Sequence, residues 1–92
     1  MNKDFYVISF ESTHYAIMTE KRLKERFPVT LIPTPRSITA SCGLSLKIDA
    51  DMVADTVQDL KSDHLNERMM VLYKIERNQE GDKATVIPWS KI

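Results

Sequence analysis

The chain has 92 residues, of which 13 are basic and 13 acidic, so its formal net charge at pH 7 is zero. This length favours a single domain, and the zero net charge argues against a general attraction for nucleic acid or for an anionic membrane. No segment approaches the roughly 20 apolar residues that span a bilayer, so we expect neither nucleic acid nor a membrane as partner.

Cysteine occurs once, at Cys42, so the chain cannot form an internal disulfide. The amino terminus, MNKDFYVISF, lacks the apolar run and the small-residue cleavage site of a secretory signal peptide. We therefore expect a cytoplasmic protein whose thiol stays reduced.

The first half of the chain predicts a strand, a helix and a second strand. Residues 5–10 (FYVISF) are aromatic and β-branched, as in a strand with apolar contacts on both faces. Charged and apolar residues between 15 and 27 follow an amphipathic helical pattern, with Ser12 or Thr13 as its cap. Pro28 ends this helix, and residues 29–32 form the second strand.

The second half predicts a strand, a helix and a strand. Residues 44–48 (LSLKI) alternate apolar and polar side chains, which indicates a strand with one buried face. Apolar residues recur at helical spacing over 52–61, with acidic residues near the amino end. Residues 69–75 then form the fourth strand.

The tail contains a turn and a further strand. Residues 78–82 (NQEGD) form a turn in which Gly81 can take a positive φ, and residues 84–87 form the last strand before Pro88. Trp89 either docks on the sheet of its own chain or mediates dimer formation, and self-docking is the favoured reading. We expect a core over about residues 4–77 and a hairpin extension over 78–92.

This order predicts an α+β fold, a ferredoxin-like split βαβ sandwich with two helices on one face of an antiparallel sheet and a carboxy-terminal hairpin arm. In that plan the third strand lies between the first and second. The end of the first strand, the start of the first helix, the start of the third strand and the connection before it then share one end of the sheet. We expect this end to bring together Cys42, Arg36, Ser12, Thr13, His14, His64 and Arg68.

Residues 31–44 (LIPTPRSITASCGL) are the most distinctive stretch, because two prolines stiffen the path to Arg36 and Gly43 follows Cys42 directly. An ordinary cysteine thiol has a pKa of about 8.5 and reacts only as the thiolate. Arg36 and the amino terminus of the first helix, at residues 12–14, are the groups that we expect to favour the thiolate.

Two motifs resemble a known family, the selenium/sulfur carrier protein-like domains. They are F-x-S-T-H-x-A at residues 10–16 and L-I-P-x-P-R-x-I-x-x-S-C-G-L at residues 31–44. The resemblance covers residues 6–75. After the arginine, Ser37, Thr39 and Ala40 replace residues usual in the family, whereas Ser41, Cys42 and Gly43 are kept.

The resemblance implies a ferredoxin-like domain that carries sulfur or selenium on Cys42 as a persulfide or selenopersulfide. Arg36 would stabilise the anionic terminal atom, while Ser41, Gly43 and Pro35 would shape the surrounding backbone. The partners implied are a cysteine desulfurase-like donor and an acceptor enzyme, because one cysteine has no internal resolving partner. The pattern calls for no cofactor or metal, and it indicates a carrier or accessory protein rather than a stand-alone enzyme.

Simpler interpretations stay open for the same residues. A lone cysteine is often a small buried hydrophobe, Arg36 can be a solvated loop residue, and both His14 and His64 suit ordinary positions near helix ends. The competing function is a noncatalytic binding or assembly module. It would use the Pro-rich loop (residues 33–41), the sheet edge or the carboxy-terminal hairpin to recruit a partner or a second copy of the chain.

Overall fold

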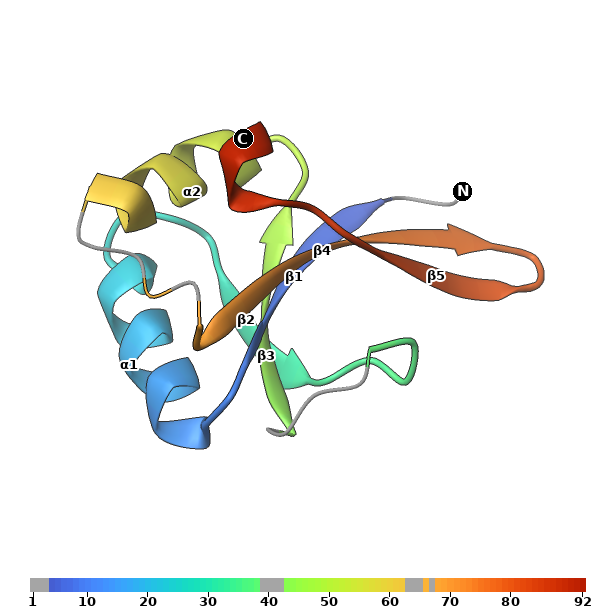
Figure 1. Cartoon of the computed structure of the whole chain (residues 1–92), viewed down its shortest axis with the longest axis horizontal. Helices are drawn as coiled ribbons and strands as arrows, with labels where there is room; N and C mark the ends of the chain where they lie inside the picture. Colours follow the sequence, from blue (N-terminus) through green and yellow to red (C-terminus); the bar gives the residue numbers. More distant parts are fainter. Residues whose placement is uncertain (1–3, 39–42, 63–65, 67) are drawn as a thin grey trace.

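A computed structural model describes residues 4–38, 43–62, 66 and 68–92 of the chain (Figure 1). In chain order its elements are β1 (Phe5–Phe10), α1 (Thr13–Lys24), β2 (Thr30–Pro33), β3 (Leu44–Asp49), α2 (Val53–Ser62), β4 (Met70–Asn78), β5 (Gly81–Val86) and the 3-10 turn η1 (Trp89–Lys91). The bounds predicted for β1 are confirmed, and those of β3 and α2 agree within one residue at each end.

The strands form one five-stranded antiparallel sheet in the order β2-β3-β1-β4-β5. As predicted, β3 lies between β1 and β2. The arrangement of strands and helices is consistent with a ferredoxin-like fold. The order differs from the predicted plan at one edge, where β5 belongs to the sheet itself because it pairs with β4 along its whole length.

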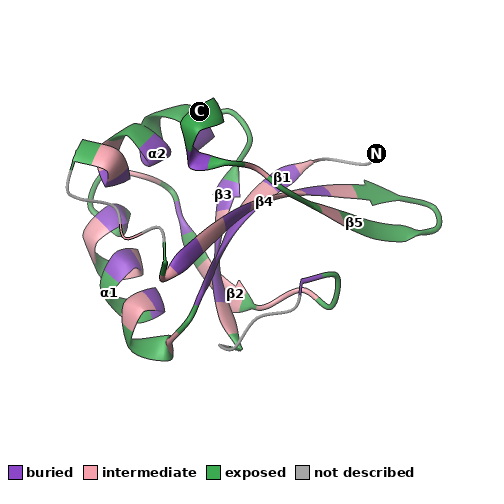
Figure 2. Cartoon of the chain, in the orientation of Figure 1, coloured by how far each residue is buried: buried purple, intermediate pink, exposed green. Residues whose placement is uncertain are grey.

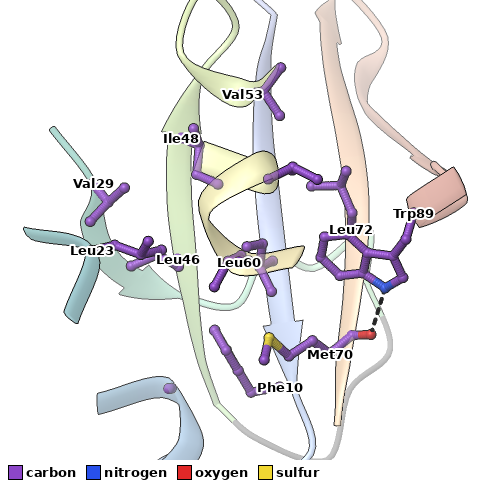
Figure 3. Packing of buried hydrophobic residues seen from close by; sticks show 13 residues of the cluster. Phe10, Leu23, Val29, Leu46, Ile48, Val53, Leu60, Met70, Leu72 and Trp89 are labelled. Atoms are coloured by element: carbon purple, nitrogen blue, oxygen red, sulfur yellow. Dashed lines mark hydrogen bonds between the residues drawn. The ribbon is translucent and has the colours of Figure 1, made fainter. Parts of the chain in front are cut away.

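Both helices lie on one face of the sheet, as predicted (Figure 1). The main hydrophobic cluster joins residues of α1 and α2 to alternate residues of the strands (Figure 3). Its largest fully buried members include Phe10, Ile8, Leu23, Leu46, Ile48 and Leu72. Because side chains alternate across a strand, the intervening residues point to the opposite face, which we call the open face.

The open face has a smaller hydrophobic cluster of its own. It comprises the buried side chains of Phe5, Val7, Ile38 and Ile75, with Ile32, Tyr73 and Ala84 packed against them. Three of the four buried members come from β1 and β4, whereas Ile38 comes from the connection between β2 and β3. Neither of the two described helices covers this face, and Ile38 of the connecting loop packs on it instead.

The predicted bounds of α1 need correction at both ends. The helix begins at Thr13 rather than at residue 15, and the Oγ of Ser12 accepts a hydrogen bond from the N–H of Tyr15 at 3.2 Å, so Ser12 is the cap and Thr13 is already helical. It ends at Lys24 rather than at residue 27. The N–H of Phe27 bonds to the Leu23 carbonyl at 2.8 Å, closing a turn that leads the chain out of the helix before Pro28.

The predicted hairpin arm is also corrected. β4 continues to Asn78 and β5 begins at Gly81, so only two residues form the turn and both strands are longer than expected. Gly81 has a φ of 126°, which confirms the predicted positive φ. The Oδ1 of Asn78 accepts from the N–H of Glu80 at 2.9 Å and fixes the turn locally.

The tail after β5 returns to the helix-covered face. Trp89 is buried in the main cluster, and its Nε1 donates to the Met70 carbonyl at 3.4 Å (Figure 3). The Nζ of Lys61 on α2 donates to the carbonyl of Ile92 at 2.7 Å. Of the two readings of Trp89, self-docking is therefore the observed one, and this tryptophan is part of the core.

Within the described ranges, neither helix has the length and the apolar composition needed to cross a membrane.

Candidate functional site

The strand ends meet as the topology predicted. The register pairs Phe10 with Met70, Ser9 with Ser45 and Pro33 with Leu44, so β1 and β2 end where β3 and β4 begin. Because α1 starts three residues after β1, its amino terminus lies at this same end of the sheet. The Pro-rich loop leaves the sheet here.

Thr34 closes the base of this loop. Its N–H donates to the Gly43 carbonyl at 2.9 Å, and its hydroxyl shares a hydrogen bond of 2.7 Å with the hydroxyl of Ser45. These bonds hold together the two chain segments on either side of residues 39–42. The predicted site residues Ser41 and Cys42 lie outside the described residues, as does His64.

Ile38 anchors the outgoing half of the loop. Its side chain is 6% exposed and packs on the open face with Phe5, Val7 and Ile75. Its N–H bonds to the Pro35 carbonyl at 3.0 Å, so residues 35–38 form a tight turn that points Ile38 at the sheet. Residues 34–38 therefore fold onto the face that the helices leave uncovered (Figure 1).

Arg36 is exposed on the tip of this turn. Together with Pro35, Ser37, Gly81 and Asp82 it lines a shallow hollow between the loop and the β4–β5 hairpin. Among the residues that the structure describes, no ion pair involves Arg36. Asp82 on the opposite wall lowers the local positive potential, which argues against a simple anion pocket.

The residues at the amino terminus of α1 share this end of the sheet with the loop, but α1 packs on the other face. Ser12 is occupied as the helix cap, and Thr13 and His14 are exposed in the first turn of α1. The helix packs on one face of the sheet, whereas Ile38 holds the loop on the other. The structure thus places Arg36 beside the hairpin, and the described part of the loop does not face Ser12 or His14.

Gly43 has no conformational need to be glycine in this structure. Its φ lies outside the left-handed region, and a Cβ built on it meets no atom of the described residues within 4 Å. The expected role of open backbone beside Cys42 is therefore compatible with the geometry, but alanine also fits there.

Hydroxyl groups beneath the loop are a feature that the sequence reasoning did not single out. Ser9 and Ser45 are cross-strand partners with exposures of 4% and 0%, and Thr34 bonds to Ser45 from the loop side. The signal was present in the alternation of FYVISF and LSLKI, where the serines occupy the open face. Polar residues at buried strand positions indicate a hydrogen-bonded patch rather than plain core.

A second hollow lies further along the open face. The Lys47 Nζ and the Arg77 Cζ each lie 4.9 Å from the centroid of the Phe5 ring, and Asp4 and Asp49 complete the lining. Cations over an aromatic face are attracted to its π electrons. Because the two acidic residues balance the two cations, this cluster is better explained as a surface that stabilises β1 than as an anion site.

The fold and the loop together define a small α+β domain with a ferredoxin-like arrangement, whose connection between β2 and β3 presents an exposed arginine. The family model described as "Putative Se/S carrier protein-like" matches residues 5–72, and the chain therefore belongs to this family. The matched segment contains α1, α2 and the entire Pro-rich loop. Neither a curated protein nor a solved structure gives a significant match to the chain.

Proposed function

We propose that the protein carries one atom of sulfur or selenium on Cys42 and passes it from a donor enzyme to an acceptor. The observation that carries this proposal is the family match over residues 5–72, which includes the loop with Arg36, Cys42 and Gly43. The proposal concerns a carrier role that works together with other enzymes, in line with the general role in the family's description.

The transfer balances without an added oxidant or reductant. The Cys42 thiolate attacks the outer sulfur of a persulfide on the donor, the sulfur–sulfur bond of that persulfide breaks, and the donor cysteine leaves as a thiolate. An acceptor thiolate then attacks the terminal sulfur on Cys42 in the same way and releases the Cys42 thiolate. A selenium atom would follow the same two displacements.

Arg36 has two properties that suit this chemistry. Its guanidinium is exposed and has no ion-pair partner among the described residues, and guanidinium groups stay charged at every physiological pH. The hydrogen bonds of Thr34 to Gly43 and Ser45 hold the two ends of the loop together, and Arg36 and Cys42 both belong to this loop in sequence. We assign Arg36 the role of stabilising the thiolate and the persulfide anion.

The remaining predicted site residues take lesser roles in this proposal. Pro35 forms the wall of the Arg36 hollow, and Gly43 and Ser41 flank Cys42 in sequence. Ser12 keeps its role as the α1 cap. His14 is exposed in the first turn of α1, at the end of the sheet where the loop begins and ends, so we assign it, with its neighbour Thr13, to the surface that a donor or acceptor enzyme would meet.

Intact-mass analysis tests the carrier role. The protein is incubated with a cysteine desulfurase and either cysteine or selenocysteine, and we expect the added mass of one sulfur or one selenium atom. The adduct should disappear on treatment with a thiol reductant and should be absent from the Cys42→Ser variant. If the wild-type protein gains no mass with either substrate, and its folded thiol is alkylated no faster than a free cysteine, the carrier proposal is wrong.

The role of Arg36 has its own test. Replacing Arg36 by alanine should raise the apparent pKa of the Cys42 thiol, by a small but measurable amount because Arg36 is exposed and water screens its charge. The pH dependence of the alkylation rate measures this change. Lys21→Ala, which removes an exposed cation from α1, is the matched control and should leave the pKa unchanged. An equal pKa in wild type and Arg36→Ala would contradict this role.

A further inference from the structure

The outer edge of β5 presents unpaired backbone groups. The N–H of Ile87 donates to the Leu72 carbonyl at 2.8 Å, and this pair continues the β4–β5 register that joins Val86 to Tyr73. In an antiparallel pair, hydrogen-bonded and non-hydrogen-bonded residues alternate. The N–H and C=O groups of Asp82, Ala84 and Val86 therefore point away from β4.

No described segment covers this edge. Asp82 and Val86 are exposed and Ala84 is half-buried, and Val86 is 55% exposed although it is a large apolar residue (Figure 2). The hairpin extends away from the two helices (Figure 1). Within the described ranges, the six outward groups of β5 therefore have only water as a partner.

The opposite edge of the sheet, formed by β2, offers few outward backbone N–H and C=O groups. β2 has four residues and ends at Pro33, which has no N–H. Because the N–H of Thr34 bonds to Gly43 on the β3 side, alternation directs Leu31 and Pro33 outward. Leu31 is then the one residue of β2 that offers both a donor and an acceptor, whereas β5 offers three such residues.

We propose that two copies of this chain associate through antiparallel pairing of their β5 strands around a two-fold axis at Ala84. In this register Ala84 pairs with Ala84 of the partner subunit, and Asp82 pairs with Val86 of the partner subunit. All six outward N–H groups of the two strands then donate to outward carbonyl groups. The two sheets become one continuous sheet, and this association is independent of the carrier role.

Side chains select this register among the symmetric alternatives. A two-fold axis at Lys83 would place two lysines directly opposite each other, which is unfavourable. An axis at Thr85 would pair Asp82 with Pro88 of the partner subunit, which has no N–H. With the axis at Ala84, Lys83 lies opposite Thr85 of the partner subunit and no like charges face each other.

The proposed pairing also brings the partner close to the Arg36 hollow. Asp82 lines that hollow and would lie opposite Val86 of the partner subunit. The hollow would then border the joined edge of the two sheets. One short strand per copy makes a small interface, so we expect weak association, visible at protein concentrations of about 0.1 to 1 mM.

Sedimentation velocity over this concentration range tests the proposal. We expect wild type to shift reversibly from monomer to dimer. Ala84→Pro removes an outward N–H without removing a β4–β5 hydrogen bond, and it should weaken the dimer by about 10- to 100-fold. Circular dichroism and thermal melting confirm that this variant stays folded.

Charge changes at Thr85 test the register without altering the edge backbone. Thr85→Glu places an acid opposite Lys83 of the partner subunit and should tighten the dimer by about 3- to 10-fold, whereas Thr85→Lys should weaken it by a similar factor. Ser90→Ala, at an exposed position of η1, is the control and should have no effect. Thr85→Glu and Thr85→Lys still test the proposal if Ala84→Pro does not fold.

Three results would overturn the proposal. Wild type that stays monomeric at about 1 mM excludes the dimer. If Ala84→Pro is folded and its dimer dissociation constant equals that of wild type, the dimer uses another surface. Equal dissociation constants for Thr85→Glu and Thr85→Lys exclude the register centred on Ala84.

Discussion

Replacing Trp89 by alanine tests whether the tail is part of the core. Trp89 is 8% exposed and packs in the main cluster, and its Nε1 donates to the Met70 carbonyl at 3.4 Å, a long and therefore weak hydrogen bond. Removing a buried tryptophan side chain costs about 3–5 kcal/mol. The free energy of unfolding of a domain of this size is about 5–14 kcal/mol, so the variant should lose about a fifth of its stability or more.

Urea denaturation followed by circular dichroism measures this loss, because Trp89 is the only tryptophan and the variant has no indole fluorescence. Trp89→Phe keeps an aromatic ring in the core and should lose less than Trp89→Ala. Ser90→Ala is the neighbouring exposed control, with an expected change within about 0.5 kcal/mol. A loss below about 1 kcal/mol for Trp89→Ala would refute the burial argument and would make the tail a detachable arm.

Three further substitutions probe the loop and the helices by the same denaturation assay. Ile38→Ala should cost about 2–4 kcal/mol because the side chain is buried on the open face, and a cost below about 1 kcal/mol would show that the loop is not anchored there. Ser12→Ala removes the α1 cap and should cost about 1 kcal/mol, whereas Thr13→Ala should cost less. Asp59→Asn weakens two ion pairs that Asp59 of α2 makes, with Arg22 of α1 at 3.4 Å and with Arg26 just after α1 at 2.8 Å. Its cost should stay below about 1 kcal/mol and shrink at high salt, since Arg26 is exposed and Arg22 is partly exposed, and a salt-independent cost would assign the effect to packing.

The candidate site was only partly predictable from sequence. The position of the loop at one end of the sheet followed from element order and the crossover rule, and the register of β1, β3 and β4 confirms it. The side of the sheet on which the loop lies did not follow. The side of the sheet depends on whether Ile38 packs against the helices or against the open face. Its partners there, Phe5 and Ile75, are far from it in sequence.

The carboxy-terminal region shows the same limit. The residues NQEGD correctly predicted the turn and the positive φ of Gly81, because the backbone conformation of a tight turn depends on a few neighbouring residues. They did not set the lengths of β4 and β5. Strand length there depends on pairing across the hairpin, which extends the ladder to Asn78 and Gly81 although both residue types favour turns.

The sequence by itself determined the order of strands and helices, a helix cap at Ser12 or Thr13 and the two-helix cover of one sheet face, since these depend on periodicity and on residues a few positions apart. Only the tertiary structure decided three features: Trp89 fills the core, Ile38 pins the loop to the open face, and Arg36 stands beside the hairpin. Each of these depends on contacts between residues distant in the chain. An apolar or charged side chain shows in sequence that it needs a partner, but the folded packing decides which partner it meets.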